Sequence, residues 1–166
     1  MAEEFRLFGT RQKFAGIFSL SAYYAFKYDL FRRKGFIVYE DKYRLKKVPG
    51  GNELELFWTC FKDIDSYARI KISAKTLIVG LDKREVTVEG VPVMMDKGNV
   101  ELEMKLDIVT DYANRWEVNS FLRTIKPLYD KYIYREKFKE LERIAFNHLY
   151  FVENSVKEFF KMESFS

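Results

Sequence analysis

The sequence predicts an α+β protein in which an antiparallel β-meander of about six strands packs under an N-terminal helix and a long C-terminal helix. Apolar and polar residues alternate with a period of two between positions 36 and 112, and apolar residues recur at helical spacing at both ends of the chain. The length of 166 residues suits one domain, spanning 1–166. The apolar face of such a sheet must be covered, and the two helices are the elements available to cover it.

Residues 14–34 are predicted to form the N-terminal helix. Two apolar lines run along this segment, with Phe14, Ile17, Phe18, Ser21, Ala25 and Tyr28 on one and Leu20, Tyr23, Tyr24 and Phe31 on the other. A helix that is apolar on two sides is usually sandwiched between other elements. The basic run 32–34 suits the C-terminal end of a helix dipole, and Gly35 supplies a left-handed stop.

The strands are predicted in the middle of the chain, at 36–48, 53–62, 67–79, 84–88, 91–95 and 100–112. Turns are expected between them at 49–52, 63–66, 89–90 and 96–99. The last strand has the clearest pattern, because apolar residues from Val100 to Ile108 alternate with charged residues from Glu101 to Asp107. This alternation is typical of an antiparallel sheet with one buried and one wet face.

The last third of the chain is predicted to be helical. Asn119 or Ser120 is expected to cap a short helix, and Pro127 to end it and to begin a second helix that continues to about Met162. Apolar residues follow a heptad-like spacing along this second helix, at Phe138, Leu141, Ala145, His148, Val152, Phe159 and Met162. Such a stripe either covers the sheet or forms an assembly surface.

Composition and charge favour a folded cytoplasmic protein over several other classes. Hydrophobic residues make up 48% and charged residues 33%, as in globular chains, and the net charge of +4 is weaker than a dedicated nucleic-acid binder shows. The single cysteine, Cys60, cannot form an internal disulfide. We expect no signal peptide and no transmembrane segment, because the uncharged run from Phe14 to Phe26 is too short to span a bilayer. Gln12 is the only glutamine among many charges, which is a thermophile-like balance.

The sequence contains no recognisable motif for catalysis, a cofactor or a metal. The phosphate loop, the Rossmann glycine pattern and the nucleophile elbow are all absent. His148 is the only histidine, and on an apolar stripe it is interpreted as a core histidine rather than a general base. Cys60, on the inner face of a strand, is interpreted as a small hydrophobe rather than a nucleophile. We therefore predict no catalytic residues, no metal ligands and no cofactor.

The aromatic content makes an apolar ligand site the leading hypothesis. Aromatic residues reach 17%, and such a surplus can fill a core, line a cavity or cover an interface. The candidate ligand-binding residues are Trp58, Trp116, Tyr24 and His148. Arg32, Arg33 and Lys34 form the candidate basic patch, for which a solvated helix end is the alternative interpretation.

The order of elements is similar to that of helix-grip domains of the START type, in which a long C-terminal helix closes a curved sheet over an apolar cavity. That family begins with a strand, and here Phe5-Arg6-Leu7-Phe8 is the segment available for it. Separately, the segments 115–117, 121–123 and 129–133 resemble part of an uncharacterised archaeal protein family. The resemblance to helix-grip domains implies an apolar ligand. The resemblance to the uncharacterised family brings no activity with it.

The hypothesis is a non-enzymatic binding or interaction domain, which holds an apolar small ligand between the sheet and the C-terminal helix. The alternative is a structural or protein-interaction module that assembles through the C-terminal helix, as a homodimer or with a protein partner. A nucleic-acid binder ranks third, and an enzyme ranks last. The first two stay open at this point because a core, a cavity and an interface share one composition.

Overall fold

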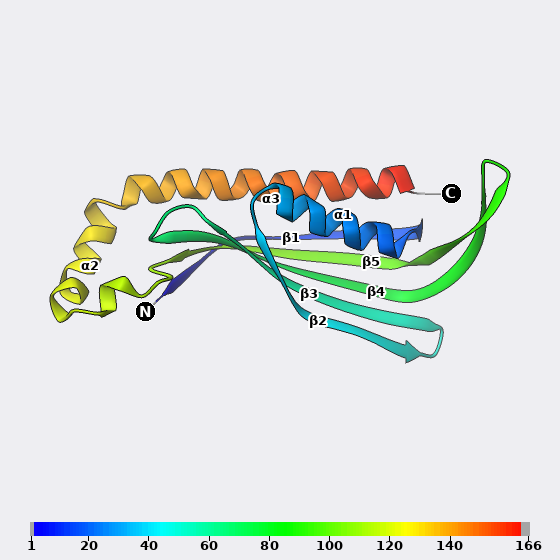
Figure 1. Cartoon of the computed structure of the whole chain (residues 1–166), viewed down its shortest axis with the longest axis horizontal. Coiled ribbons are helices and arrows are strands. Elements are labelled where there is room, and N and C mark those ends of the chain that lie inside the picture. The colour runs from blue at the N-terminus through cyan, green and yellow to red at the C-terminus, as the bar shows by residue number, and fades with distance from the viewer. Residues whose placement is uncertain (1, 164–166) are drawn as a thin grey trace.

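The computed structural model describes residues 2–163 and has an α+β fold, as the sequence predicts. The elements are β1 (Glu3–Phe18), α1 (Leu20–Arg33), β2 (Ile37–Val48), β3 (Gly51–Asp63), β4 (Ala68–Val88), β5 (Val91–Thr110), a 3₁₀ turn at Arg115–Glu117, α2 (Ser120–Tyr132) and α3 (Arg135–Glu163). Figure 1 shows them as one twisted sheet with helices along it.

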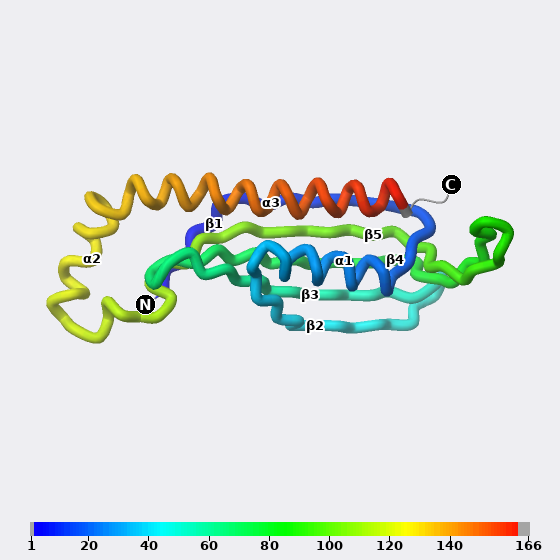
Figure 2. The backbone as a smooth tube through the Cα atoms, turned by 45° about the horizontal axis from the view of Figure 1, so that its top comes forward, coloured from blue at the N-terminus to red at the C-terminus, as the bar shows by residue number. Residues whose placement is uncertain are grey.

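The sheet has the strand order β1-β5-β4-β3-β2, and every neighbouring pair is antiparallel. Strands β2 to β5 form a meander, while β1 lies at the far edge and pairs with β5 from Glu3 opposite Thr110 to Phe18 opposite Asp96. Since β1 and β2 are at opposite edges, the chain between them crosses the sheet, and α1 makes this crossing (Figure 2).

Both α1 and α3 lie on the same face of the sheet, so the molecule has two layers (Figure 1). Inward-facing side chains of the three central strands are almost fully buried, which confirms the predicted inner faces of 53–62 and 100–112. The core includes Leu54, Leu56, Trp58 and Cys60 of β3, Ile70 and Ile72 of β4, and Leu102, Met104 and Leu106 of β5. Helix α3 covers the β1 side of this face and α1 covers the β2 side.

The predicted start of the first helix at residue 14 is wrong, because β1 continues to Phe18 and α1 begins only at Leu20. Residues 12 to 15 alternate between inward and outward positions: Gln12 and Phe14 are half-buried, whereas Lys13 and Ala15 are exposed. Ser19 then caps the helix by accepting a hydrogen bond from the backbone N–H of Ala22. The apolar residues around position 17 fit both the helical period and the strand period, and pairing with β5 makes this segment a strand.

The structure has five strands, not the predicted six or so. Segments 67–79 and 84–88 belong to one strand, β4, which passes through an irregularity between Val79 and Asp82. Segments 91–95 and 100–112 likewise join in β5, so the predicted turn at 96–99 is extended chain. We define the β4–β5 arm as residues 84–95, which pair with each other past the end of the sheet (Figure 2).

The break between the two C-terminal helices is not at Pro127. Asn119 caps α2 as expected, accepting from the backbone N–H of Phe121, but α2 continues through Pro127 to Tyr132. The chain turns at Ile133 and Tyr134, and α3 starts at Arg135.

The predicted stripe of α3 faces the sheet, with a slight rotation. Its most buried positions are Leu141, Ala145, Leu149, Val152, Val156 and Phe160. His148 and Phe159 are half-buried, and Met162 is exposed. The sheet therefore occupies most of the surface that the alternative hypothesis assigned to assembly.

Candidate functional site: a groove where the edge strand meets the C-terminal helices

Helix α3 meets the edge strand β1 along a line of aromatic contacts, which we call the β1–α3 seam. Its rings are Phe5, Phe8 and Phe14 of β1 and Phe138, Phe146, Tyr150 and Phe160 of α3. The ring centroids of Phe5 and Phe138 are 5.4 Å apart, those of Phe8 and Phe146 are 5.9 Å apart, and those of Phe14 and Phe160 are 4.3 Å apart. A groove opens near each end of the seam.

The larger groove, which we call the α2–α3 groove, has a volume of about 600 Å³. Its apolar walls come from Phe5 of β1, Pro127 of α2, Tyr134 in the turn before α3, and Phe138 of α3. This volume is within the range of small-molecule sites, which are concave, largely apolar and furnished with a few polar groups.

Tyr134 is the most informative residue of this groove. The residue is buried, with a relative exposure of 3%, and its hydroxyl has no hydrogen-bond partner among residues 2–163. Burial raises the pKa of this phenol, and Asp65 acts in the same direction. The hydroxyl is therefore a proton donor at neutral pH, and a buried donor without an acceptor costs about 1–3 kcal/mol. An acceptor on a bound molecule, or a water, would remove that cost.

An aromatic cluster holds Tyr134 in place. The ring of Tyr67, which follows the β3–β4 turn, lies 4.8 Å from the Tyr134 ring, edge to face. The ring of Tyr129 stacks on Tyr134 at 5.9 Å and lies 4.8 Å from Trp116. The hydroxyl of Tyr67 donates to Asp130 of α2 at 2.6 Å, which ties α2 to the sheet.

Charged residues surround the apolar walls of the α2–α3 groove. Lys131, Arg135 and Lys139 contribute cations at its rim. Three carboxylates also line the groove, those of Glu3, Asp130 and Glu142; Glu3 pairs with Lys126 at 2.9 Å and Asp130 accepts from Tyr67. The rim therefore suits a ligand whose polar end accepts hydrogen bonds or carries negative charge.

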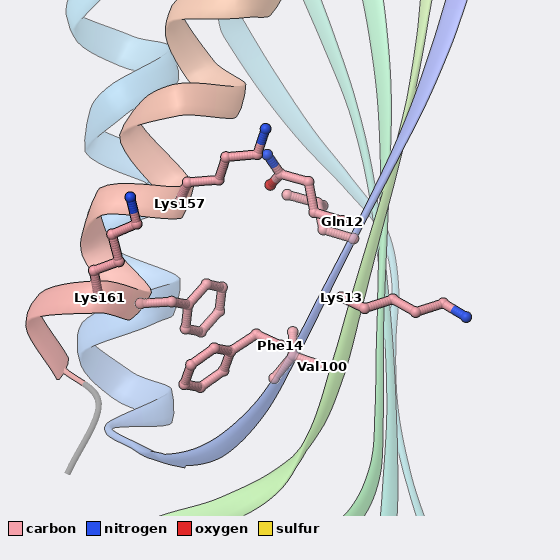
Figure 3. Close-up of a pocket in the computed structure, with 8 residues that line it drawn as sticks. Gln12, Lys13, Phe14, Val100, Lys157 and Lys161 are labelled. Atoms are coloured by element: carbon pink, nitrogen blue, oxygen red, sulfur yellow. The ribbon is translucent and has the colours of Figure 1, made fainter. Parts of the chain in front are cut away.

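The smaller groove, of about 190 Å³, lies at the other end of the seam (Figure 3). Phe14 forms its floor with Phe160, and Figure 3 shows Lys157 and Lys161 of α3 on the opposite wall, while Lys13 points away. The amide of Gln12 donates to the backbone oxygen of Glu153 at 2.9 Å. This groove is too small for most cofactors, so the α2–α3 groove is the stronger candidate site.

A buried lysine lies between α1 and the sheet. Lys27 has no exposed surface, its ammonium donates to the hydroxyl of Thr76 at 2.9 Å, and it lies 4.1 Å from the ring centroid of Trp58. Tyr23 shares the same Thr76 hydroxyl at 3.0 Å. Burial lowers the pKa of Lys27 to about 7, against the opposing effects of Cys60 and Glu40.

The four predicted ligand residues lie in three separate places. Trp58 is buried beneath α1, and Tyr24 packs against it edge to face at 5.1 Å, both donating to Glu40. His148 lies on α3 against Phe36, and burial together with Lys62 and Lys34 lowers its pKa. Trp116 belongs to the aromatic cluster beside the α2–α3 groove.

The predicted basic patch sits at the C-terminal end of α1. Arg33 pairs with Asp29 one turn earlier, and the ammonium of Lys34 lies 3.8 Å from the ring centroid of Phe151. Arg32 is exposed.

Comparison with family models and with curated proteins finds no match. None of the helices within residues 2–163 is long and apolar enough to cross a membrane. In the same part of the chain, no three His, Cys, Asp or Glu side chains gather as ligands for a metal ion.

Proposed function

We propose that this protein is a non-enzymatic binding module that holds a small apolar molecule in the α2–α3 groove, between the sheet edge and the C-terminal helices. Two observations carry the proposal: Tyr134 lines the groove, and its buried hydroxyl has no hydrogen-bond partner within residues 2–163. A native interior seldom leaves such a donor unsatisfied. A bound molecule that offers an acceptor to the Tyr134 hydroxyl would therefore be stabilised.

The residues that line the groove indicate which class of ligand it would hold. Its apolar part packs against Phe5, Pro127 and Phe138, and its acceptor receives the hydrogen bond from Tyr134. The cations of the rim favour a carboxylate, sulfonate or phosphate over a neutral acceptor. The element order, with its resemblance to helix-grip domains, supports the same ligand class, although the space directly between α3 and the central strands is filled by side chains.

The first experiment is native mass spectrometry of the purified protein, followed by binding of 8-anilinonaphthalene-1-sulfonate as a probe with an apolar ring system and one sulfonate. Tyr134→Phe keeps the ring and removes only the hydroxyl. We expect this change to weaken probe binding about tenfold, which corresponds to one hydrogen bond of about 1.4 kcal/mol. The unfolding free energy should stay the same or rise, since the unpartnered donor is gone.

Tyr150→Phe is the matched control, because Tyr150 lies on the same seam but is 47% exposed and is not part of the groove. It should bind the probe like the original protein. Equal affinities of the Tyr134→Phe and original proteins, or no saturable probe binding at all, would refute the proposed site.

Assembly through the C-terminal helix is the competing proposal, and it has less support. The stripe from Leu141 to Phe160 packs on the sheet, and the exposed face of α3 presents only Tyr150 and Phe151 as large aromatic groups. A clean dimer without any bound molecule in the native mass spectrum would favour assembly.

Nucleic-acid binding has less support than either. The outer sheet face does carry cations beside aromatic rings, as in Lys42 and Lys75 around Phe57. Several cations on this face pair with carboxylates, however: Lys42 with Glu55, Lys71 with Glu4, Arg69 with Asp63 and Arg11 with Glu103. A paired cation gains little from a phosphate.

A further inference from the structure

The β4 side of the β4–β5 arm is a free strand edge. Strand β4 pairs with β3 only as far as Leu81, but it pairs with β5 as far as Val88. Within residues 2–163, the segment from Arg84 to Val88 therefore has a neighbouring strand on one side only. An irregularity at Gly80, which has a positive φ of 68°, lies at the base of the arm, and the arm projects past the end of α3 (Figures 1 and 2).

The turn at the tip of the arm decides which backbone groups of β4 face the free edge. Glu89 and Gly90 have φ angles of 49° and 80°, as a two-residue type I′ turn requires. The pair that closes such a turn is hydrogen-bonded, and hydrogen-bonded pairs alternate along a hairpin with non-hydrogen-bonded ones. By this alternation Glu85 and Thr87 belong to the second kind, so their N–H and C=O groups face away from β5.

The β5 side of the arm is the less suitable edge for a further strand. Pro92 lies opposite Thr87 and has no backbone N–H, so a strand on that side would miss one donor. Proline is one of the usual devices that protect a strand edge from pairing. The β4 side from Arg84 to Val88 contains no proline, and its β-branched residues favour extended chain.

The charges of this edge allow it to pair with a second copy in one register. Antiparallel pairing by two-fold symmetry places one residue opposite its own copy. A centre at Arg84 or at Glu85 would place a charge opposite the same charge. A centre at Thr87 would place Glu85 opposite Glu89. Only a centre at Val86 avoids like charges, because Glu85 then lies opposite Thr87 of the second copy.

The charges at the base of the arm are compatible with this register. Asp82 lies opposite Lys97 within the same chain, and Lys83 pairs with Asp96 at 2.7 Å. These four residues together carry no net charge. Arg84 comes opposite an apolar residue of the second copy, and Lys83 comes beside the glutamate at its tip, which has the opposite charge.

The same register joins two apolar surfaces. Val86 lies opposite Val93 and Val88 opposite Val91, so these four side chains share one face of the arm. Val91 and Val93 are 60% and 38% exposed. Between the two copies, Val86 would meet its own counterpart in a non-hydrogen-bonded pair, where side chains come closest.

We propose that the protein forms a two-fold symmetric dimer through the β4 edge of the arm, with Arg84–Val88 of the two copies paired antiparallel about Val86. Glu85 of each copy exchanges backbone hydrogen bonds with Thr87 of the other. Two ribbons, each marginally stable by itself, become one four-stranded sheet. The contact is short, so the dimer is weak, and in dilute protein the arm remains a two-stranded ribbon.

Sedimentation equilibrium of the purified full chain over a range of concentrations tests the association. We expect a monomer–dimer equilibrium. Thr87→Pro removes the N–H that the contact needs at each of its two symmetric positions and spares the pairing with β5, which does not use this N–H. The dissociation constant should rise at least about tenfold. Thr87→Ser keeps the N–H, so it is the matched control and should associate like the original protein.

Disulfide trapping tests the register without a proline in the arm. Val86→Cys places two thiols opposite each other at a Cα separation of about 4.5 Å, which a disulfide can bridge. Oxidised glutathione should therefore convert this variant to a covalent dimer. Val93→Cys is the matched control, because it lies on the same face but on β5, away from the axis, and it should cross-link much more slowly. The native Cys60 is buried.

Three results would overturn the proposal: a monomer at every concentration, equal association of the Thr87→Pro and Thr87→Ser proteins, or equal cross-linking of the two cysteine variants. A dimer that survives Thr87→Pro would assign association to another surface, such as α3. The proposal is independent of the α2–α3 groove, so Thr87→Pro should keep the affinity of the original protein for 8-anilinonaphthalene-1-sulfonate.

Discussion

Lys27 is a lysine without exposed surface in the layer between α1 and the sheet. Its ammonium has one hydroxyl partner, Thr76, and two aromatic faces, those of Trp58 and Tyr23, in place of water. These contacts do not fully replace hydration, and the pKa falls from 10.5 to about 7. The folded protein therefore releases this proton more readily than the unfolded chain does.

This difference predicts a pH dependence of stability. Above pH 10.5 the lysine is neutral in both states and carries no charge penalty. As pH falls towards 7, only the unfolded chain gains the proton, so the folded state loses stability until Lys27 itself is protonated. Lys27→Met should raise the unfolding free energy by roughly 1–3 kcal/mol at pH 7, since lost contacts with Trp58 and Thr76 offset part of the gain.

Urea unfolding at pH 7 and pH 10 measures this effect. The advantage of Lys27→Met over the original protein should shrink or change sign at the higher pH, where the charge penalty is nearly absent. Lys139→Met, at an exposed position, is the control and should show no such trend. A constant difference across the range would mean that Lys27 keeps its ordinary pKa.

Thr76 connects two buried polar groups, so its removal has a predictable cost. Thr76→Val keeps the shape of the side chain but leaves both the Tyr23 hydroxyl and the Lys27 ammonium without their partner. We expect a loss of about 2–4 kcal/mol in the original protein. In the Lys27→Met background the loss should be smaller by about 1 kcal/mol or more, as measured by a double-mutant cycle.

Sequence patterns predict neither the buried ammonium of Lys27 nor the buried hydroxyl of Tyr134. Lys27 lies four residues after Tyr23 and three before Leu30, both buried, so the sequence places it on a buried line of the helix, but its hydrogen bond to Thr76 depends on the fold. Tyr134 is buried in the turn between α2 and α3, and its hydroxyl has no partner within residues 2–163, which no local pattern indicates. Of the predicted ligand residues, only Trp116 lies beside the α2–α3 groove, where aromatic content alone suggested a site.

At the scale of elements, the alternation of apolar and polar residues predicted the buried face correctly in strands whose two faces differ in polarity. The inner faces of β3 and β5 follow from Leu54 to Cys60 and from Val100 to Ile108. The pattern failed in β1, because the run from Phe14 to Phe18 is apolar on both sides and local periodicity cannot choose between helix and strand. Pairing with β5, a contact between distant segments, makes that choice.

The β4–β5 arm is the element least supported by its surroundings. Beyond Leu81, β4 has no partner other than β5, and the exposed residues Val91, Val93 and Met94 lie near the tip. A two-stranded ribbon is marginally stable by itself. Amide hydrogen exchange should therefore be much faster at Val86 and Val88 than at Ile70 and Ile72 of the same strand, and equal protection would indicate a partner for the arm.

For the whole molecule, the fit of α3 on the sheet decides whether the long helix is a core element or an assembly surface. Leu149 is fully buried in the middle of that contact. Leu149→Ala should cost about 2–5 kcal/mol of unfolding free energy and leave the oligomeric state unchanged. If the substitution instead shifts a concentration-dependent mass without lowering the unfolding midpoint, α3 serves assembly.

The pairing of the first strand with the last has a consequence for synthesis on the ribosome. Strand β1 can join the sheet only after Thr110, the partner of Glu3, has been synthesised. Leu149 and Val152 of α3, which cover the apolar face of the sheet, are synthesised later still. A nascent chain that has emerged as far as Tyr112 holds every strand but not α3, so the apolar side of its sheet is open to chaperones or to other nascent chains. The timing of α3 emergence therefore sets the interval during which this protein is most exposed to aggregation.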